Sequence, residues 1–366
     1  MVAALRAQEG EHFFKMIPLL FSHQANPDLR DKHGKTALHI ACERLHKDSI
    51  LALLQQGAKP DLQDNEMNTP LHLVCVKNFQ EAVTLLLEHG ANPDLRDKLG
   101  DVPLHIACFY GHEQIMKSLI EGGASVNVQD GRGDTPLHCI LPHRALQSDA
   151  LLSYLLEKGA DVDIQNFSGQ TPIHYLMSFD ISHFNLFELL LQHSSKIDLL
   201  DLRGKTALHC ACESKCLEFA EALVQRGASV DIQDNEGNTS LHLACQNQWA
   251  IEAFVKSSTT KDIQNNKRMT ALHIAVLVQH HAATRYLLTH GVSITVTDSD
   301  GRTAVDVNFK KDPIVSRLLE IRTLVDHNTW NKGVEWCRAL FLADGKYFVV
   351  SSLSPLAFEE KPVYIY

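Results

Sequence analysis

Apolar and polar positions in residues 102–134 predict two short helices followed by a polar finger. Position 102 is where a helix cap is expected, and Pro103 follows at the first helical position. Proline has no backbone N–H, and this is not unfavourable there because an N–H at that position has no partner within the helix. The turn GHEQ leads into a second helix over Glu113–Glu121, with Ile115, Leu119 and Ile120 on its apolar face. Two glycines end this helix, and ASVNVQDGRGD then runs out and back as a hairpin finger. Such a unit cannot bury its apolar face alone, so it requires neighbours of the same kind.

The same pattern recurs along the chain at a nearly fixed period. Tetrapeptides of the type Thr-Pro-Leu-His begin at positions 36, 69, 102, 135, 171, 206, 239 and 270, and a decayed copy begins at 303. The steps between copies range from 31 to 36 residues, and most are 33. With this period and this tetrapeptide the chain resembles the ankyrin-repeat family over about residues 1–325, including an incomplete unit before the first copy.

The resemblance implies an all-α fold, a helical-repeat solenoid with β-hairpin fingers in which helix pairs form a curved stack. We assign the ankyrin-repeat solenoid to residues 1–325 and a C-terminal extension of unrecognised type to residues 326–366. This extension contains an aromatic-rich stretch expected to be helical, followed by a strand-like KYFVVSS.

Eight histidines end the tetrapeptides, and they could be metal ligands, proton shuttles or structural residues. Each stands at the third helical position, where its ring can hydrogen-bond back toward the cap or to the neighbouring finger. Equivalent histidines are one repeat apart, roughly 8–10 Å, which is too far to share an ion at bond lengths of about 2 Å. The sequence therefore favours a structural role.

The nine cysteines raise the same question about zinc or disulfides. Five of them fall six residues after a tetrapeptide begins, a small buried position in each unit: Cys42, Cys75, Cys108, Cys212 and Cys245. We expect reduced cysteines that pack as small hydrophobic side chains. The sequence predicts no metal site and no cofactor.

Composition and charge narrow the choice of partners. The net charge of −10 is uneven, with −13 in residues 1–254, +4 in residues 255–322 and −1 in the remainder. A long acidic region repels phosphate backbones, so we expect no nucleic acid as the main partner. No apolar run reaches the roughly 18 residues of a membrane span, and Glu9 and Glu11 precede the first apolar stretch, which argues against a signal peptide. We expect a monomeric intracellular protein in the cytoplasm, with the nucleus as the alternative.

Several units depart from the pattern. Met67 and Arg268 occupy the position of the turn glycine, and a non-glycine residue in left-handed backbone costs roughly 1 kcal/mol, so we expect these fingers to be reshaped. The seventh unit has lost two residues, and its second helix ends in VKSSTTKD without the usual Gly-Ala. A weak point is expected there.

No constellation for chemistry is present: there is no phosphate-binding glycine loop, nucleophile elbow or HExxH motif. The sequence therefore favours a non-enzymatic protein-interaction scaffold. The resemblance implies that the partner binds the concave face formed by finger tips and first helices. An alternative is an adaptor, such as a ubiquitin-ligase substrate receptor, whose C-terminal extension recruits effector machinery. A third alternative, an enzyme with its active part in the extension, is disfavoured because some forty residues hardly enclose a pocket.

Large apolar residues at positions that are normally polar mark the expected binding centre on the third to sixth units. They lie at finger tips and on the neighbouring first helix: Leu99, Phe109, Tyr110, Phe167 and Leu202. Trp249 and Met269 are secondary candidates. The alternative is that these side chains pack on adjacent fingers.

Asn127 keeps the Val-Asn pair that is common in ankyrin fingers, and Leu119 stands eight residues upstream. In this it resembles the sites modified by the oxygen-sensing asparaginyl hydroxylase. The favoured alternative is a hydrogen-bonding turn residue.

Overall fold

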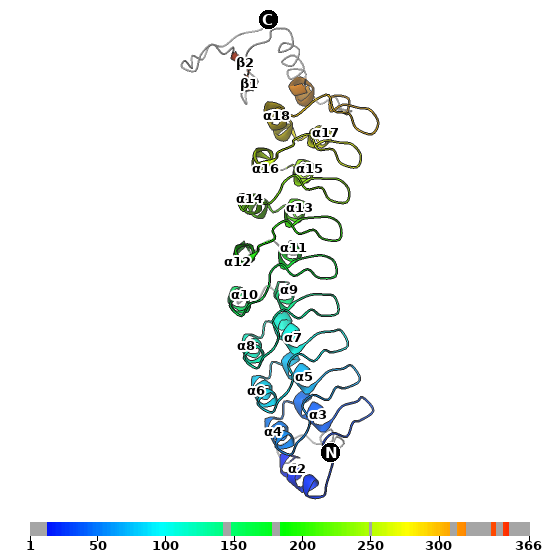
Figure 1. The fold of residues 1–366 in the computed structure, drawn as a ribbon, viewed down its shortest axis with the longest axis vertical. Coiled ribbons are helices and arrows are strands. Elements are labelled where there is room, and N and C mark those ends of the chain that lie inside the picture. The colour runs from blue at the N-terminus through cyan, green and yellow to red at the C-terminus, as the bar shows by residue number, and fades with distance from the viewer. Residues whose placement is uncertain are drawn as a thin grey trace. The chain divides into compact units, whose positions relative to one another are not determined.

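The computed structural model describes residues 13–141, 148–177, 184–248, 251–307, 313–319, 338–341 and 347–350 (Figure 1). The chain divides into two compact units, Met1–Leu202 and Arg203–Tyr366. The described parts of both units are built mainly from helix pairs separated by polar fingers, so the all-α helical-repeat class is confirmed.

In the first unit the helices form two columns, and the fingers project on the side of the first helices (Figure 1). The first helices of the repeats are α3 (Ala37–Glu43), α5 (Pro70–Val76), α7 (Pro103–Tyr110), α9 (Pro136–Ile140) and α11 (Pro172–Leu176). The second helices are α2 (Phe13–Ser22), α4 (Lys47–Gln55), α6 (Gln80–Glu88), α8 (Glu113–Glu121), α10 (Ser148–Glu157) and α12 (Phe184–His193). The predicted bounds of α8 are confirmed, and α2 is the second helix of the expected incomplete unit.

The second unit repeats the arrangement. Its first helices are α13 (Ala207–Glu213), α15 (Ser240–Gln246) and α17 (Ala271–Leu277). Its second helices are α14 (Leu217–Gln225), α16 (Glu252–Ser257) and α18 (His281–Thr289), and residues 313–319 form a further helical segment. Toward the C-terminus, β1 (Arg338–Phe341) pairs antiparallel with β2 (Tyr347–Val350), with Arg338 opposite Val350.

The strand β1 corrects one expectation. The aromatic-rich stretch was predicted to be helical, but its last residues, 338–341, form a strand, whereas the predicted strand in KYFVVSS is confirmed as β2. The physical reason is strand pairing, because two short apolar segments gain backbone hydrogen bonds from each other. The sequence Asp344-Gly345 between them is a typical hairpin signal that a helical interpretation ignores.

The core of each helix pair is a row of leucines on the second helices. Wherever the repeat pattern is regular, the leucine at one equivalent position of the second helix has no exposed surface: Leu53, Leu86, Leu119, Leu155, Leu190, Leu223 and Leu287. Each contributes roughly 1.5–3 kcal/mol by burial. In α8, Ile115 is buried as predicted, but Ile120 is only half-buried and Met116 fills the core in its place.

The first residue of each tetrapeptide caps its first helix, which begins at the second residue. Thr36 lies in extended backbone, and its hydroxyl oxygen accepts the N–H of His39 at 3.4 Å. Nδ1 of His39 in turn accepts the Thr36 N–H at 3.2 Å. A reciprocal capping box results, with histidine where glutamate or glutamine is usual. Val102 has no hydroxyl, so at α7 only the histidine half remains, from the Val102 N–H to Nδ1 of His105 at 3.1 Å.

The other ring nitrogen of the histidine reaches the next finger. Nε2 lies 3.0–3.2 Å from a backbone carbonyl oxygen one repeat further on, in the pairs His39–Asn68, His72–Asp101, His105–Asp134, His138–Gln170, His209–Asn238, His242–Met269 and His273–Arg302. A carbonyl oxygen only accepts, so Nε2 must carry the proton, and Nδ1 must be unprotonated to accept the cap N–H. Desolvation on burial lowers the pKa of all seven. The structural role predicted for these histidines is confirmed.

An Asx side chain orders each finger tip. In the finger 97–101, a carboxylate oxygen of Asp97 accepts the N–H groups of Leu99 and Asp101 at 2.8 and 2.9 Å. The N–H of Gly100, at φ +82°, donates to the Asp97 carbonyl oxygen at 3.0 Å. Apart from a single bridge between Thr297 and Thr303, the described fingers contain no strand pairing. The fingers are therefore tight turns rather than long hairpin ladders.

The expected reshaping of two fingers is wrong. Met67 and Arg268 adopt the glycine conformation themselves, at φ +63° and φ +55°. Their N–H groups make the usual turn bonds, to Asp64 O at 3.0 Å and to Asn265 O at 2.7 Å. The Asx hydrogen bonds and the neighbouring fingers over-determine the turn, so the backbone accepts a local strain of roughly 1 kcal/mol instead of changing shape.

In the seventh unit, which lacks the glycine cap, hydroxyl groups after α16 bind the aspartate of the preceding finger, as Ser125 binds Asp94 in the third unit. Ser258 Oγ donates to one carboxylate oxygen of Asp231 at 2.6 Å, and Thr259 donates its N–H and its hydroxyl to the other at 2.8 and 2.6 Å. Burial raises the pKa of Asp231, but these hydrogen bonds outweigh it and the pKa is lowered overall. The helix α16 has only six residues, and the weak point expected in this unit stays a prediction.

Eight cysteines are free and buried in the described parts of the chain, as the sequence predicts, and desolvation raises the pKa of seven of them, to about 11 for Cys216. Because the thiolate is the reactive form, we expect them to react with a maleimide at least about a hundredfold more slowly in native buffer than in urea. The measurement requires Cys337→Ser, since Cys337 lies outside the described residues. Rapid native labelling at Cys42, Cys75 or Cys108 would show that the helix pairs open readily.

Candidate protein-interaction surface

Neighbouring finger tips of the first unit are joined by backbone hydrogen bonds. From residue 97 to residue 202, each tip donates an N–H to the carbonyl oxygen of the preceding tip at 2.9–3.0 Å: Gly131 to Leu99, Phe167 to Arg132, and Leu202 to Ser168. A second row of bonds comes from glutamine side chains. The amide of Gln129 donates to Gly133 O in its own finger at 2.8 Å and to Gln165 O of the next at 2.9 Å. Side chains at the tips are therefore presented from a firmly positioned backbone.

Three of the predicted interface residues lie on these tips and are exposed: Leu99 at 72%, Phe167 at 67% and Leu202 at 72%. Phe167 and Leu202 are on adjacent fingers, whereas the finger 130–134 separates them from Leu99. The Phe167 ring lies over Gly133, since a Cβ on that glycine would be 2.6 Å from Phe167 Cδ1. Packing on a neighbouring finger therefore orients Phe167 but leaves most of its surface free.

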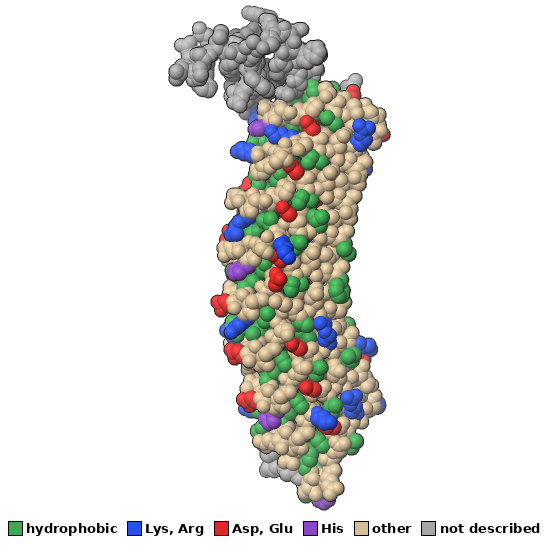
Figure 2. All heavy atoms as spheres, viewed as in Figure 1, with side chains coloured by type: hydrophobic (Ala, Val, Ile, Leu, Met, Phe, Trp, Pro, Cys, Tyr) green, Lys and Arg blue, Asp and Glu red, His purple; other side chains and the backbone are tan. Residues whose placement is uncertain are grey.

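Phe109 and Tyr110 lie at the end of α7 and are 43% and 50% exposed. Their ring centroids are 5.2 Å apart in an edge-to-face arrangement, and Tyr110 also stacks on His112 at 5.6 Å. Aromatic contacts of this kind hold the rings in place without burying them. On the face shown in Figure 2, hydrophobic side chains are spread among charged ones and form no single continuous patch.

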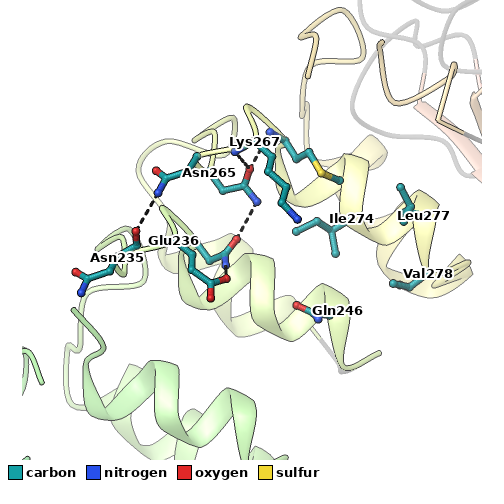
Figure 3. Close-up of a pocket in the computed structure, with 11 residues that line it drawn as sticks. Asn235, Glu236, Gln246, Asn265, Lys267, Ile274, Leu277 and Val278 are labelled. Atoms are coloured by element: carbon teal, nitrogen blue, oxygen red, sulfur yellow. Dashed lines mark hydrogen bonds between the residues drawn. The ribbon is translucent and has the colours of Figure 1, made fainter. Parts of the chain in front are cut away.

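The two secondary candidates differ. Trp249 lies outside the described residues. Met269 is half-buried and lines a pocket of about 590 Å³ in the second unit, between the fingers 234–238 and 265–269 and the helices α15 and α17 (Figure 3). Met269 was predicted from the sequence as a secondary contact, but Ile274, Leu277 and Val278 were not, although their apolar character is visible in the sequence.

At one contact between adjacent fingers, two carboxyl groups lie next to each other. Desolvation, followed by the charges of Asp97 and Asp130, raises the pKa of Asp101 to about 6, and its side chain hydrogen-bonds Asp130. One repeat further on the same position is Asp134, and there an amide faces the carboxylate: Asn166 Nδ2 donates to Asp134 at 2.8 Å. Asp101 therefore stands where an amide would fit better than an ionised carboxylate.

We expect Asp101→Asn to stabilise the protein by about 1–2 kcal/mol near neutral pH, after discounting for partial exposure. A carboxyl with a raised folded pKa costs stability above that pKa and regains it as the pH falls, so the gain should shrink below about pH 6. Urea unfolding of the variant and wild type at several pH values measures this. Asp134→Asn is the matched control, and an equal gain there would assign the effect to charge reduction in general.

Asn127 uses both ends of its side-chain amide. Its Oδ1 accepts the N–H of Asp161 at 2.8 Å, and its Nδ2 donates to Gly159 O at 3.0 Å, although the residue itself is exposed. At the corresponding position of the preceding finger, Asp94 accepts the N–H of Ser125 at 2.9 Å. Asn127 therefore makes the hydrogen bonds expected of a turn residue, and its side-chain amide is held in one orientation at the surface.

Two further features bear on the class of site. Among the described residues, no group of three or more histidine, cysteine, aspartate or glutamate side chains is arranged to hold a metal ion. A search of the same residues finds no helix that is both long enough and apolar enough to cross a bilayer.

Comparison with known proteins identifies the repeat. The family model for ankyrin repeats (3 copies) matches residues 1–97, 91–166, 142–234, 181–264 and 227–298. Among solved structures, the chain is similar to the ankyrin repeat domain of Bcl-3, described as a unique member of the IkappaB protein family. The two share 27% identity at a TM-score of 0.52 over 58% of this chain and 95% of that chain. No curated protein matches the sequence. With period, capping histidines and finger turns in agreement with these matches, the chain belongs to the ankyrin-repeat family, whose fold is a protein-interaction scaffold.

Proposed function

We propose that this protein is a non-enzymatic scaffold that binds a protein partner on the finger tips and first helices of its third to sixth repeats. The observation that carries the proposal is the exposure of Leu99, Phe109, Tyr110, Phe167 and Leu202 on positioned backbone. Exposed apolar anchors on a rigid support are the usual energetic centre of an interface. Met269 and Trp249 are secondary contact candidates. We further propose that the protein acts as a monomer inside the cell, in the cytoplasm or nucleus.

The test begins with affinity purification or proximity labelling to obtain a partner. We expect Leu99→Ala together with Phe109→Ala to weaken partner binding by about tenfold or more, because truncating an interface anchor costs more than about 1 kcal/mol. Leu19→Ala is the matched control, since Leu19 is 58% exposed but lies on the second helix α2. Affinity within twofold of wild type in the double variant would refute the assignment of the surface.

The alternative function is an adaptor whose residues 326–366 recruit effector machinery such as a ubiquitin ligase. Co-purification with the full chain and with residues 1–325 distinguishes the two. An adaptor loses its effector and keeps its client when the extension is removed. A simple scaffold retains all its partners.

The amide of Asn127 is also a candidate for hydroxylation at its β-carbon. It is exposed, held in one orientation and next to a regular finger turn, and these features support the proposal. Mass spectrometry of the tryptic peptide from animal cells tests it. A peptide with no added oxygen would leave Asn127 as a turn residue alone.

A further inference from the structure

The pocket of the second unit has an apolar floor of four residues, Met269, Ile274, Leu277 and Val278. In the sequence of each repeat, the last finger residue and the residues five, eight and nine positions later correspond to these four. At position 269 and its equivalents the chain has Lys35, Asn68, Asp101, Asp134, Gln170, Lys205, Asn238, Met269 and Arg302. Met269 alone is apolar, and Ile274, Leu277 and Val278 complete the set.

Two repeats earlier in the same unit, an ion pair occupies the equivalent groove positions. Lys205 forms an ion pair with Glu213 across its own finger and first helix, with 11% and 38% of the side chains exposed. At the next repeat the two positions are the amides Asn238 and Gln246. From one repeat to the next, the side chains at these groove positions therefore change from an ion pair to two amides to apolar residues. In the apolar repeat a large side chain stays exposed, since Leu277 is 48% exposed.

The polar rim of the pocket is largely occupied by its own hydrogen bonds. Asn266 Nδ2 donates to Asn235 O at 2.9 Å, and Asn265 Nδ2 donates to Asn238 Oδ1 at 2.9 Å (Figure 3). Glu236 accepts from Asn238 Nδ2 at 3.3 Å. An incoming ligand therefore finds few free amides on this side.

Lys267 is the cation on the rim of the pocket, and Glu236 of the preceding finger is the carboxylate that lines the same pocket. Lys267 extends from its finger toward α17 and Ile274 (Figure 3). It is exposed and forms no ion pair with any side chain of the described residues, and its neighbour Arg268 adds a second exposed cation. A cation beside an apolar floor is complementary to a carboxylate next to an apolar side chain.

We propose that this pocket binds an extended segment of a partner protein that carries one large aliphatic or aromatic side chain and an acidic residue close to it. The apolar side chain lies on Met269, Ile274 and Leu277, and the carboxylate pairs with Lys267. Neighbouring repeats are roughly 8–10 Å apart, which an extended chain spans in about three residues, so both groups belong to one short segment. A volume of about 590 Å³ suits a side chain with its flanking backbone. The proposal rests on the proposed function and adds a second subsite with defined chemistry.

A phage-displayed library of random peptides, selected on the full-length protein, tests this chemistry. We expect enriched sequences to pair a large apolar residue with Asp or Glu within about three positions. A fluorescein-labelled peptide of the enriched sequence is then titrated by anisotropy. Lys267→Glu should weaken its binding about fivefold and Leu277→Asn about tenfold, whereas Lys267→Arg should retain it. Both altered residues are exposed, and unchanged thermal midpoints would show that the variants fold.

A charge exchange separates ion pairing from general damage. A peptide with lysine in place of its acidic residue should bind the Lys267→Glu protein better than wild type. The proposal is overturned if no peptide is enriched, if enriched peptides lack the acidic–apolar pair, or if both weakening variants bind like wild type. Leu99→Ala with Phe109→Ala should leave this peptide's affinity unchanged, so failure of the pocket and failure of the finger-tip surface are measured independently.

Discussion

Lowering the pH from about 7.5 to about 5 will destabilise this protein strongly, and its capping histidines will account for the loss. Each of the seven donates from Nε2 to a carbonyl oxygen and accepts at Nδ1 from a backbone N–H. Protonation places a second donor against that N–H and charges a buried ring. The folded state therefore resists the proton that the unfolded state takes up.

The sign and size follow from His242, whose pKa burial lowers to about 4 from the ordinary 6.5. A group with a depressed pKa of this kind contributes its full stability above 6.5 and loses it as the pH falls. At pH 5 the loss from His242 alone is about 2 kcal/mol. The other six shift in the same direction, and Asp101, whose pKa is raised to about 6, opposes them only in part.

Urea unfolding at a series of pH values measures this slope. His242→Gln should lower stability at neutral pH, since it breaks the bond to Met269 O, but should flatten the dependence on pH below 6.5. His89→Gln, at an exposed position, is the control and should leave the slope as it is. A wild-type stability that stays level between pH 7 and 5 would contradict the neutral-imidazole assignment.

The second large effect is expected from Gly100→Ala. Gly100 has φ +82°, and an added Cβ would lie 2.5 Å from the backbone nitrogen and 2.9 Å from Cα of Gly131 on the next finger. Both atoms belong to backbone held by the Gly131-to-Leu99 hydrogen bond, so they cannot move aside cheaply. We expect a loss of about 2–4 kcal/mol, of which roughly 1 is backbone strain and the rest is overpacking.

Gly90→Ala is the matched control for this substitution. Gly90 has φ +81°, but nothing lies within 4 Å of its added Cβ. Backbone strain is therefore the same in both variants, and only the contact between fingers differs. Thermal unfolding of the pair isolates that contact. Equal losses would mean that the fingers are not stacked as closely as described.

The helices and their caps were predictable from the sequence because both depend on local chemistry. The bounds of α8, the role of His39 and its equivalents, and the burial of Cys42 follow from spacing within one unit. What lay beyond prediction depends on groups from two units. The contacts of Asp231, for example, come from Ser258 and Thr259 of the next unit.

The candidate surface was predictable to a similar degree. Exposure of Leu99 and Phe167 follows from a polar position occupied by an apolar residue, and the structure agrees. That Phe167 lies over Gly133, and that Lys267 forms no ion pair with a described side chain although Glu236 lines the same pocket, are facts about adjacent fingers. A sequence read one repeat at a time does not contain them.

The histidine bonds give the array a direction. Each ring depends on a carbonyl of the finger that follows it, so removing a later repeat leaves a buried donor unsatisfied, whereas removing an earlier one frees only a carbonyl that water can reach. The ninth copy ends this dependence. Asp306 accepts the N–H and the hydroxyl of Thr303 at 2.8 and 2.7 Å, and its carboxylate has no proton to donate onward. The change from imidazole to carboxylate thus removes the need for a carbonyl acceptor from a following finger. Asp306→His would restore a ring N–H that requires such an acceptor from a tenth finger.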